Sequence, residues 1–212
     1  MNESLASDGR ITPLRERQLI QRAQRGCKES ARALIESHQD RLHAFVWRMV
    51  RDRHESEEIC QDAFLRAFAA LDGFDPAYRF STWLFTIGYR LSLNSIRRRR
   101  EYAGDVDFAA FSRKGEERDS VSDEIANSEE AIRLRKIIWN SVDELTPAQR
   151  GAVLLFYRES MSCQEIGQVL GMPAATIKSH LHRARQRLKD LLVEQLGDSW
   201  TMVRFDDAAG MA

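Results

Sequence analysis

The sequence of 212 residues lacks long apolar runs and has only three cysteines. No stretch approaches the roughly 18 apolar residues that a membrane helix requires. The N-terminal residues MNESLASDGR have neither the basic nor the apolar region of a signal peptide. We therefore expect a cytoplasmic protein with no direct membrane insertion. Cys27, Cys60 and Cys163 are far apart in no metal-binding spacing, which favours reduced thiols over a redox or zinc role.

The sequence also lacks the patterns on which common catalytic sites depend. His38, His43 and His54 have no metal-ligand spacing, and there is no glycine-rich phosphate loop. The carboxylates cluster at the start of one helix or in the acidic middle of the chain. We expect no catalytic residues, no metal and no cofactor, so an enzyme acting on nucleic acid is the less favoured hypothesis.

No convincing strand alternation occurs, whereas helical periodicity recurs through most of the chain. The fold class that we predict is all-α. It consists of two small helical domains, an N-terminal bundle and a C-terminal helix-turn-helix domain, joined by an acidic flexible linker. The predicted boundaries are 12–100 for the first domain, 101–127 for the linker, 128–195 for the second domain and 196–212 for a tail.

The formal net charge of zero conceals three strongly charged blocks. From Phe74 to Arg100 six arginines stand against one aspartate, a net charge of +5. From Glu101 to Glu130 ten acidic residues stand against three basic ones, a net charge of −7. From Ile166 to Lys189 there are five basic residues and no acidic residue, a net charge of +5. Two basic blocks flanking an acidic linker indicate an anionic partner such as nucleic acid. A loosely packed helix is the alternative for the acidic segment.

The N-terminal domain is predicted to contain four helices. Thr12 and Pro13 form a good start for the first, and apolar spacing predicts a second from about Glu29 to Val50. The segment HESEEICQDAFLRAFAAL predicts a third helix, with carboxylates in its first turns. The fourth is expected to begin near Ser81, whose hydroxyl would cap it.

The loop GFDPAYRF precedes this fourth helix and carries Phe74, Tyr78 and Phe80. Aromatics beside a basic helix can stack on unpaired bases while arginines hold phosphates. The outward face of the helix is predicted to contain Arg90, Asn94, Arg97 and Arg98. The alternative is that the aromatics, Trp83 and Phe85 included, are core anchors and that the arginines form a solvated helix end.

The C-terminal domain contains the most specific pattern. Thr146 and Pro147 start one helix, and Ser162 with Glu165 has the spacing of a capping box. A short helix is then expected to end near Gly171, before a longer helix that starts near Pro173. Short helix, glycine turn and longer helix form a helix-turn-helix motif. The exposed side of the second helix is basic, which favours a reader of the DNA major groove over a purely structural element.

Three motifs in this order resemble bacterial sigma factors of the sigma-seventy family, extracytoplasmic-function (ECF) group. They are SEEICQDAFLRAFAAL, FDPAYRFSTWLFTIGYRLSLNSIRRRR and LTPAQRGAVLLFYRESMSCQEIGQVLGMPAATIKSHLHRARQRLKDLL. The resemblance covers about Leu19 to Leu192. It implies a transcription initiation factor that binds core RNA polymerase, recognises two elements of promoter DNA and helps to melt it. It also implies a cognate anti-sigma factor as a partner.

The resemblance assigns roles to three sets of residues. Those implied to dock on the polymerase are Glu58, Gln61, Asp62, Phe64, Leu65 and Arg66. Those implied to bind the minus-ten element are Tyr78, Arg79, Phe80, Ser81, Trp83, Arg90, Asn94, Arg97 and Arg98. Those implied to bind the minus-thirty-five element are Thr176, Lys178, Ser179, His182, Arg183, Arg185 and Arg187.

Some positions depart from the family pattern. Many relatives have Asn where this chain has Arg90 and Asp where it has Asn94, and His182 stands where an aromatic residue or arginine is common. These departures bear on which promoter sequence is preferred, and they leave the DNA-binding role that the resemblance implies for these positions unchanged. A helix-turn-helix repressor or activator that is not a polymerase subunit is the alternative function, disfavoured because the first domain has its own basic face and aromatic loop.

Overall fold

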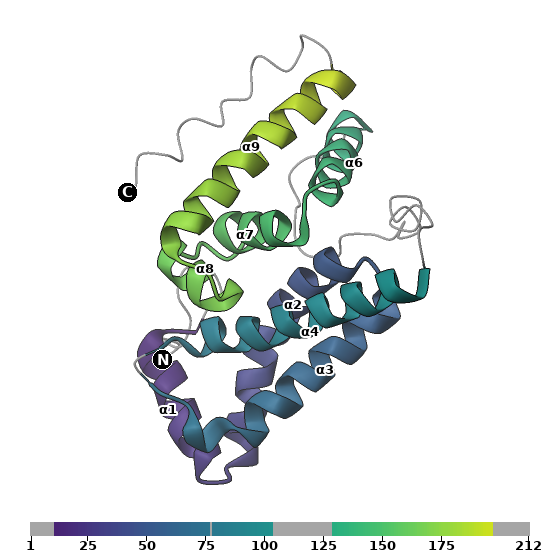
Figure 1. Cartoon of the computed structure of the whole chain (residues 1–212). Coiled ribbons are helices and arrows are strands. Elements are labelled where there is room, and N and C mark those ends of the chain that lie inside the picture. Colours follow the sequence, from purple (N-terminus) through teal and green to yellow (C-terminus); the bar gives the residue numbers. More distant parts are fainter. Residues whose placement is uncertain (1–10, 77, 104–128, 197–212) are drawn as a thin grey trace.

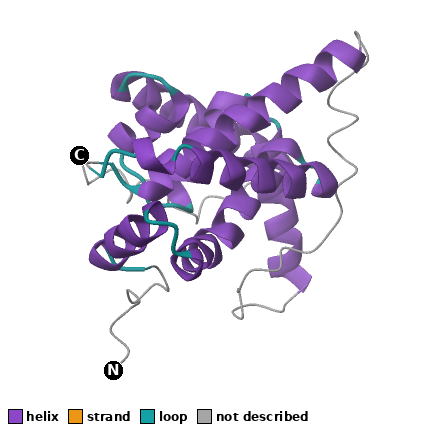
Figure 2. Cartoon of the chain, turned by 90° about the horizontal axis from the view of Figure 1, so that it is seen from below, coloured by secondary structure: helices purple, strands orange, loops and turns teal. Residues whose placement is uncertain are grey.

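The computed structural model describes residues 11–76, 78–103 and 129–196, and all regular structure in these ranges is helical (Figures 1 and 2). The all-α prediction is therefore confirmed, while the tail and most of the predicted linker lie outside the described residues. The helices of the N-terminal domain are α1 (Pro13–Gln24), α2 (Lys28–Val50), α3 (Arg53–Ala69), the short 3₁₀ helix η1 (Leu71–Gly73) and α4 (Phe80–Ala103). Those of the C-terminal domain are α6 (Glu129–Asp143), α7 (Pro147–Tyr157), α8 (Cys163–Leu170) and α9 (Ala174–Leu196).

Local capping explains where several helices begin. The Thr12 hydroxyl accepts a hydrogen bond from the Arg15 amide at 3.4 Å, and the Asp52 carboxylate accepts one from the Glu55 amide at 2.8 Å. Ser162 and Glu165 form the predicted capping box at the start of α8. One boundary differs from the prediction, because α4 begins at Phe80 and Ser81 therefore lies inside its first turn.

The N-terminal core lies where α2, α3 and α4 meet. Leu34, Leu42, Leu84 and Phe85 have no exposed surface, and the Phe45 and Phe85 rings meet edge to face with centroids 5.2 Å apart. These apolar residues recur at helical spacing along α2 and α4, so each helix turns one stripe toward the others. The resulting bundle holds the α3–α4 loop and the basic face of α4 in place.

The C-terminal core is built around the helix-turn-helix formed by α8 and α9. Ile166 and Ile177 are fully buried between the two helices, and Leu181 is nearly so. Gly171 ends α8 in the left-handed conformation with φ 70°, as the sequence predicted, which glycine adopts without steric cost. Helix α6 was not predicted, and it packs against α9.

The two domains are in contact along α4 with α8 and along α2 with α7 (Figure 1). Tyr89 of α4 is 2% exposed and lies directly against Gly151 of α7, where a Cβ would come within 3.0 Å of its ring. Burial raises the pKa of the Tyr89 phenol to about 12, so it stays protonated at neutral pH. We call this contact region between the domains the seam.

Polar groups at the C-terminal end of α2 extend the seam. The Arg150 guanidinium of α7 is buried and donates to the Met49 carbonyl oxygen at 3.1 Å and to those of Asp143 and Leu145. Arg51 pairs with Asp143 at 2.9 Å. Burial raises the pKa of the Asp143 carboxyl, whereas Arg51 and Arg150 act in the opposite direction. The C-terminal domain is therefore joined to α2 by hydrogen bonds as well as by packing.

Candidate nucleic-acid and polymerase interfaces

Helix α3 presents most of its predicted polymerase-docking residues to solvent. Glu58, Gln61, Leu65 and Arg66 are exposed, and Leu65 retains 70% of its surface, unusual for a side chain of this kind. The partly exposed Asp62 pairs with Arg66 one turn later at 2.9 Å, and this hydrogen bond raises the pKa of the Arg66 guanidinium. The result is an exposed strip of mixed charge around an apolar centre.

Phe64 differs from the other members of that set because it is 8% exposed and packs in the core. It stacks on Phe68 with ring centroids 6.4 Å apart. Cys60, on the same buried face, has its thiol pKa raised to about 12 by burial and by the Glu57 carboxylate. A thiol in that state is a poor nucleophile, so its surroundings do not resemble those of a redox-sensing cysteine.

The α3–α4 loop and the start of α4 form an aromatic cluster. Phe74 packs against Phe80 and Trp83 with centroid separations of 5.9 and 5.0 Å, and Phe80 has no exposed surface. Ser81 is also buried. Tyr78, in contrast, is 52% exposed. Of the loop aromatics, Phe74 and Phe80 therefore act as core anchors, whereas the ring of Tyr78 is open to solvent.

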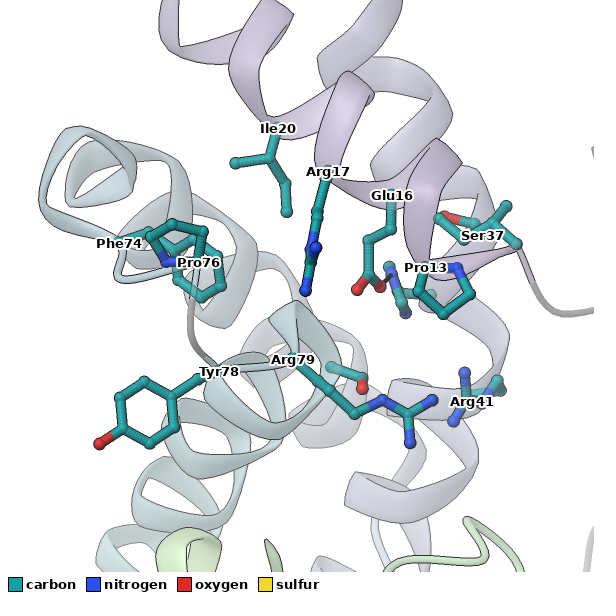
Figure 3. Close-up of a pocket in the computed structure, with 13 residues that line it drawn as sticks. Pro13, Glu16, Arg17, Ile20, Ser37, Arg41, Phe74, Pro76, Tyr78 and Arg79 are labelled. Atoms are coloured by element: carbon teal, nitrogen blue, oxygen red, sulfur yellow. Dashed lines mark ion pairs between the residues drawn. The ribbon is translucent and has the colours of Figure 1, made fainter.

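A cavity of about 390 Å³ opens between this loop, α1 and α2 (Figure 3). Its polar lining includes Arg17, Arg41, Arg79 and the buried ring of His38. The His38 Nε2 atom lies 3.1 Å from the Glu16 carboxylate without the alignment of a hydrogen bond. The apolar side chains of Ile20 and Phe74 and the carboxylate of Glu16 also line the cavity. Sequence reasoning missed this cavity, because α1 and α2 contribute residues far from the loop.

The arginines of α4 are of two kinds, exposed and paired within the domain. Arg90, Asn94, Arg97 and Arg98 are exposed, as predicted, on the side of α4 away from the core. Arg99 instead pairs with Glu55 and donates to the Val50 carbonyl oxygen at 2.7 Å, which ties α4 to the start of α3. The exposed arginines can therefore meet phosphates, whereas Arg99 has a structural role.

The second helix of the helix-turn-helix, α9, presents a basic face. Its exposed predicted residues are Lys178, Ser179, His182, Arg183 and Arg187, and Thr176 and Arg185 are partly exposed. The Ser179 hydroxyl donates to the Ala175 carbonyl oxygen at 3.1 Å. In a DNA-binding helix-turn-helix the N-terminal part of this helix contacts base edges. The described residues contain no group of three or more side chains suited to hold a metal ion.

Family models match both domains. The model described as Sigma-70 region 2 matches residues 34–102, and the one described as Sigma-70, region 4 matches residues 135–188. The ECF RNA polymerase sigma factor SigW of Bacillus subtilis is 28% identical over 82% of this chain and 94% of its own length. The ECF RNA polymerase sigma factor SigE of Mycolicibacterium smegmatis is 32% identical over 78% of this chain and 63% of its own length.

Two solved structures share the fold. One is CnrH in complex with the cytosolic domain of CnrY, with a TM-score of 0.63, 24% identity, and coverage of 85% of this chain and 98% of that one. The other is the sigma factor RpoE in complex with the anti-sigma factor NepR from Bartonella quintana, with a TM-score of 0.58 and 24% identity. It covers 76% of this chain and 95% of that one.

A helical bundle followed by a helix-turn-helix, each matched by its own region model, defines a two-domain transcription initiation factor, and the chain belongs to the sigma-70 family. Within that family it is a sigma factor of the extracytoplasmic-function group. None of the helices in the described ranges combines the length and apolar character of a membrane-crossing segment.

Proposed function

We propose that this sigma factor docks on core RNA polymerase through α3 and reads a promoter with two separate surfaces. The observation that carries the proposal is that each helical domain presents its own exposed basic face, one on α4 and one on α9. The α4 face with the adjacent cavity takes the melted minus-ten element, and the α9 face takes the minus-thirty-five duplex. Both surfaces act by binding, and the factor performs no catalytic step itself.

The minus-ten surface combines a cavity with exposed arginines. An unpaired base in the cavity would find the His38 ring and arginine donors for its polar edge, and Ile20 and Phe74 for its apolar surface. Tyr78 would stack on a neighbouring base, and Arg90, Arg97 and Arg98 would contact phosphates. The fully buried Phe80 supports this surface by packing under the loop, and the partly exposed Trp83 packs against it and can still meet DNA.

The partners follow from the same proposal. Core polymerase and promoter DNA are the two that the function requires, and both are cytoplasmic. RpoE of Bartonella quintana was solved in complex with an anti-sigma factor. We propose that a cognate anti-sigma factor also binds this chain and covers one or more of these surfaces.

Reversing the charge of Asp62 tests the polymerase-docking surface. Asp62→Arg is expected to weaken binding of core polymerase by about tenfold or more, because a like charge is placed beside Arg66 and toward a basic partner surface. Affinity is measured by fluorescence anisotropy with labelled factor, and helicity by circular dichroism. Asp190→Arg is a matched control, since Asp190 is also exposed and accepts a side-chain hydrogen bond within its helix, from Gln186. Unchanged affinity in a folded Asp62→Arg variant would remove α3 from the proposal.

The two kinds of contact on α9 are separated by alanine substitution. Lys178→Ala is expected to cost about 1–3 kcal/mol and to relax specificity at one base position, because Lys178 lies in the part of α9 that meets base edges. Arg187→Ala is expected to weaken binding to all DNA sequences alike. It should also lower the slope of log affinity against log salt concentration by about one. Both are measured by binding selection on a randomised duplex at several salt concentrations. Sequence profiles and salt slopes identical to wild type would contradict the assignment.

The competing function is a repressor or activator that binds DNA without polymerase. Run-off transcription with purified core enzyme on genomic fragments distinguishes the two. A sigma factor yields specific transcripts only when core enzyme and factor are both present. Site-specific duplex binding by the factor alone, with no effect on transcript start sites, would favour the competing function.

A further inference from the structure

Helix α1 has an exposed outer face that extends beyond the cavity. Its inner face is formed by the buried Leu19 and Ile20, and Glu16 lies 3.1 Å from the buried His38. Glu16 is the only acidic residue between Pro13 and Lys28. The exposed polar side chains of this stretch, which we call the α1 face, are Arg17, Gln18, Gln21, Arg22, Gln24, Arg25 and Lys28. The α1 face therefore has four cations and no exposed carboxylate.

The α1 face is held in a fixed position next to the start of the α3–α4 loop. The Cys27 amide donates to the Arg22 carbonyl oxygen at 3.0 Å, and Gly26 between them is in the left-handed conformation with φ 83°. This Schellman arrangement ends the helix in a defined turn. The Gln24 side chain donates from Nε2 to the Leu71 carbonyl oxygen at 2.9 Å, which ties the same end of α1 to η1. The cations of the α1 face are therefore displayed from a rigid support.

The α1 face begins at the cavity. Arg17 is exposed and also lines the cavity, and Figure 3 shows its side chain extending into it. Gln21 and Arg25 follow Arg17 at four-residue spacing, so all three lie along one stripe, about 6 Å of rise apart. Gln18 and Arg22 form the neighbouring stripe by the same spacing. Hydrogen-bond donors therefore recur at each turn from the cavity to the end of α1.

The helix dipole explains only part of this pattern. Cations near the C-terminal end of a helix are favoured by the dipole, which accounts for Arg22 and Arg25 but not for Arg17. It also does not account for the lack of exposed carboxylates, since the exposed side of α3 mixes both signs and pairs Asp62 with Arg66. Guanidinium, ammonium and amide donors without competing carboxylates suit the phosphate oxygens of a nucleic acid. The α1 face thus has the chemistry of a phosphate-binding surface.

We propose that the α1 face is a track for the melted strand, on which Arg22, Arg25 and Lys28 bind phosphates of the nucleotides next to the base held in the cavity. The 12 residues of α1 are about 18 Å long, the length of about five stacked nucleotides at 3.4 Å each. Gln18 and Gln21 bond phosphate oxygens or base edges between the cations. The inference rests on the proposed function, because the cavity must hold an unpaired base for the strand to continue along α1.

The experiment removes two cations that lie beyond the cavity. Arg22→Gln with Arg25→Gln, the track variant, keeps polar side chains of good helix propensity. Arg53→Gln with Arg133→Gln is the matched control, because it removes two exposed arginines from α3 and α6. Full-length factor is titrated with a labelled single-stranded DNA of mixed sequence, about 12 nucleotides long, within the usual site sizes for such surfaces. Fluorescence anisotropy at several salt concentrations gives the affinity, and circular dichroism checks the fold.

The track variant is expected to bind the strand on the order of tenfold less tightly than wild type at about 0.1 M salt. The slope of log affinity against log salt concentration should fall by about 1.4, the loss of two phosphate contacts to a single strand at about 0.7 each. The difference in affinity should therefore shrink as salt is raised. The control variant should match wild type in both affinity and slope.

Three outcomes would overturn the proposal. Strand affinity and salt slope equal to wild type in a folded track variant would show that the α1 face does not bind phosphates. An equal loss of affinity for a duplex of the same length would assign the face to double-stranded DNA. Weaker binding of core polymerase with unchanged strand affinity would assign it to the polymerase.

Run-off transcription by the wild-type factor with core polymerase is measured in parallel. Absence of specific transcripts from wild type would contradict the proposed function itself. Specific transcripts from wild type, together with a track variant that binds the strand as wild type does, would contradict the track alone.

Discussion

Replacing Arg150 with methionine is expected to lower the free energy of unfolding by about 3–5 kcal/mol, the range for removing one partner from a buried charged network. The guanidinium is 7% exposed and donates to three carbonyl oxygens, those of Met49, Asp143 and Leu145. Methionine fills similar space but leaves these acceptors without a donor, and a buried unsatisfied acceptor is costly. Urea unfolding followed by circular dichroism measures the change.

Arg150→Lys is the control for charge. A lysine keeps the positive charge near Asp143 but lacks the planar group that reaches several acceptors at once. We therefore expect Arg150→Lys to lower the free energy of unfolding by less than Arg150→Met does. The Met49 carbonyl belongs to α2, so Arg150→Met should also weaken the contact between the two domains. An Arg150→Met protein as stable as wild type would mean that water replaces the lost donors.

Gly167→Ala is the second change with a large expected effect. A Cβ at Gly167 would come 2.6 Å from the backbone oxygen of Met172, in the turn between α8 and α9. Backbone cannot move aside as a side chain can, so the turn must open. Inside a helix alanine is favoured over glycine by roughly 1 kcal/mol. Overpacking of this kind is expected to outweigh that gain and to leave a net loss of stability of about 1–3 kcal/mol. We expect the helix-turn-helix to lose stability and duplex binding together.

Gly73→Ala provides the matched control, because a Cβ there has no atom within 4 Å and Gly73 is outside the left-handed region. Its effect on stability should stay within about 0.5 kcal/mol. Thermal unfolding and binding to a minus-thirty-five duplex are measured for both variants. Equal stability of Gly167→Ala and wild type would show that the α8–α9 turn is more deformable than its geometry indicates.

Local signals were sufficient to predict most of the helices. The pair Thr146 and Pro147, the capping box of Ser162 and Glu165, and Gly171 each act within a few residues, so their effect is visible in the sequence. Helix α6 was missed because its acidic start continues the composition of the preceding segment. The half-buried Leu134, Ile137 and Ile138 show the helical spacing that could have revealed it.

The candidate site was predicted less completely than the fold. The burial of Phe64 could have been inferred, because it shares helical spacing with Cys60 and Ala67 on the inner face of α3. Pairings such as Arg41 with Glu159, 118 residues apart, could not. They depend on how two domains meet, and no periodicity within either domain specifies that. The assigned contacts with DNA and polymerase remain predictions.

The polar composition of the seam has a consequence for solubility. Interfaces that never open are largely apolar, and separating them exposes surfaces that aggregate. Here Arg51, Asp143 and Arg150 lie beside Tyr89 and Gly151 in the same contact region. Were the domains to part, water could replace the partners of the charged groups, so that only the apolar part of the seam, which includes the Tyr89 ring, would lose its cover. The polar groups of the seam therefore lower the tendency to aggregate that separation of the domains would otherwise bring.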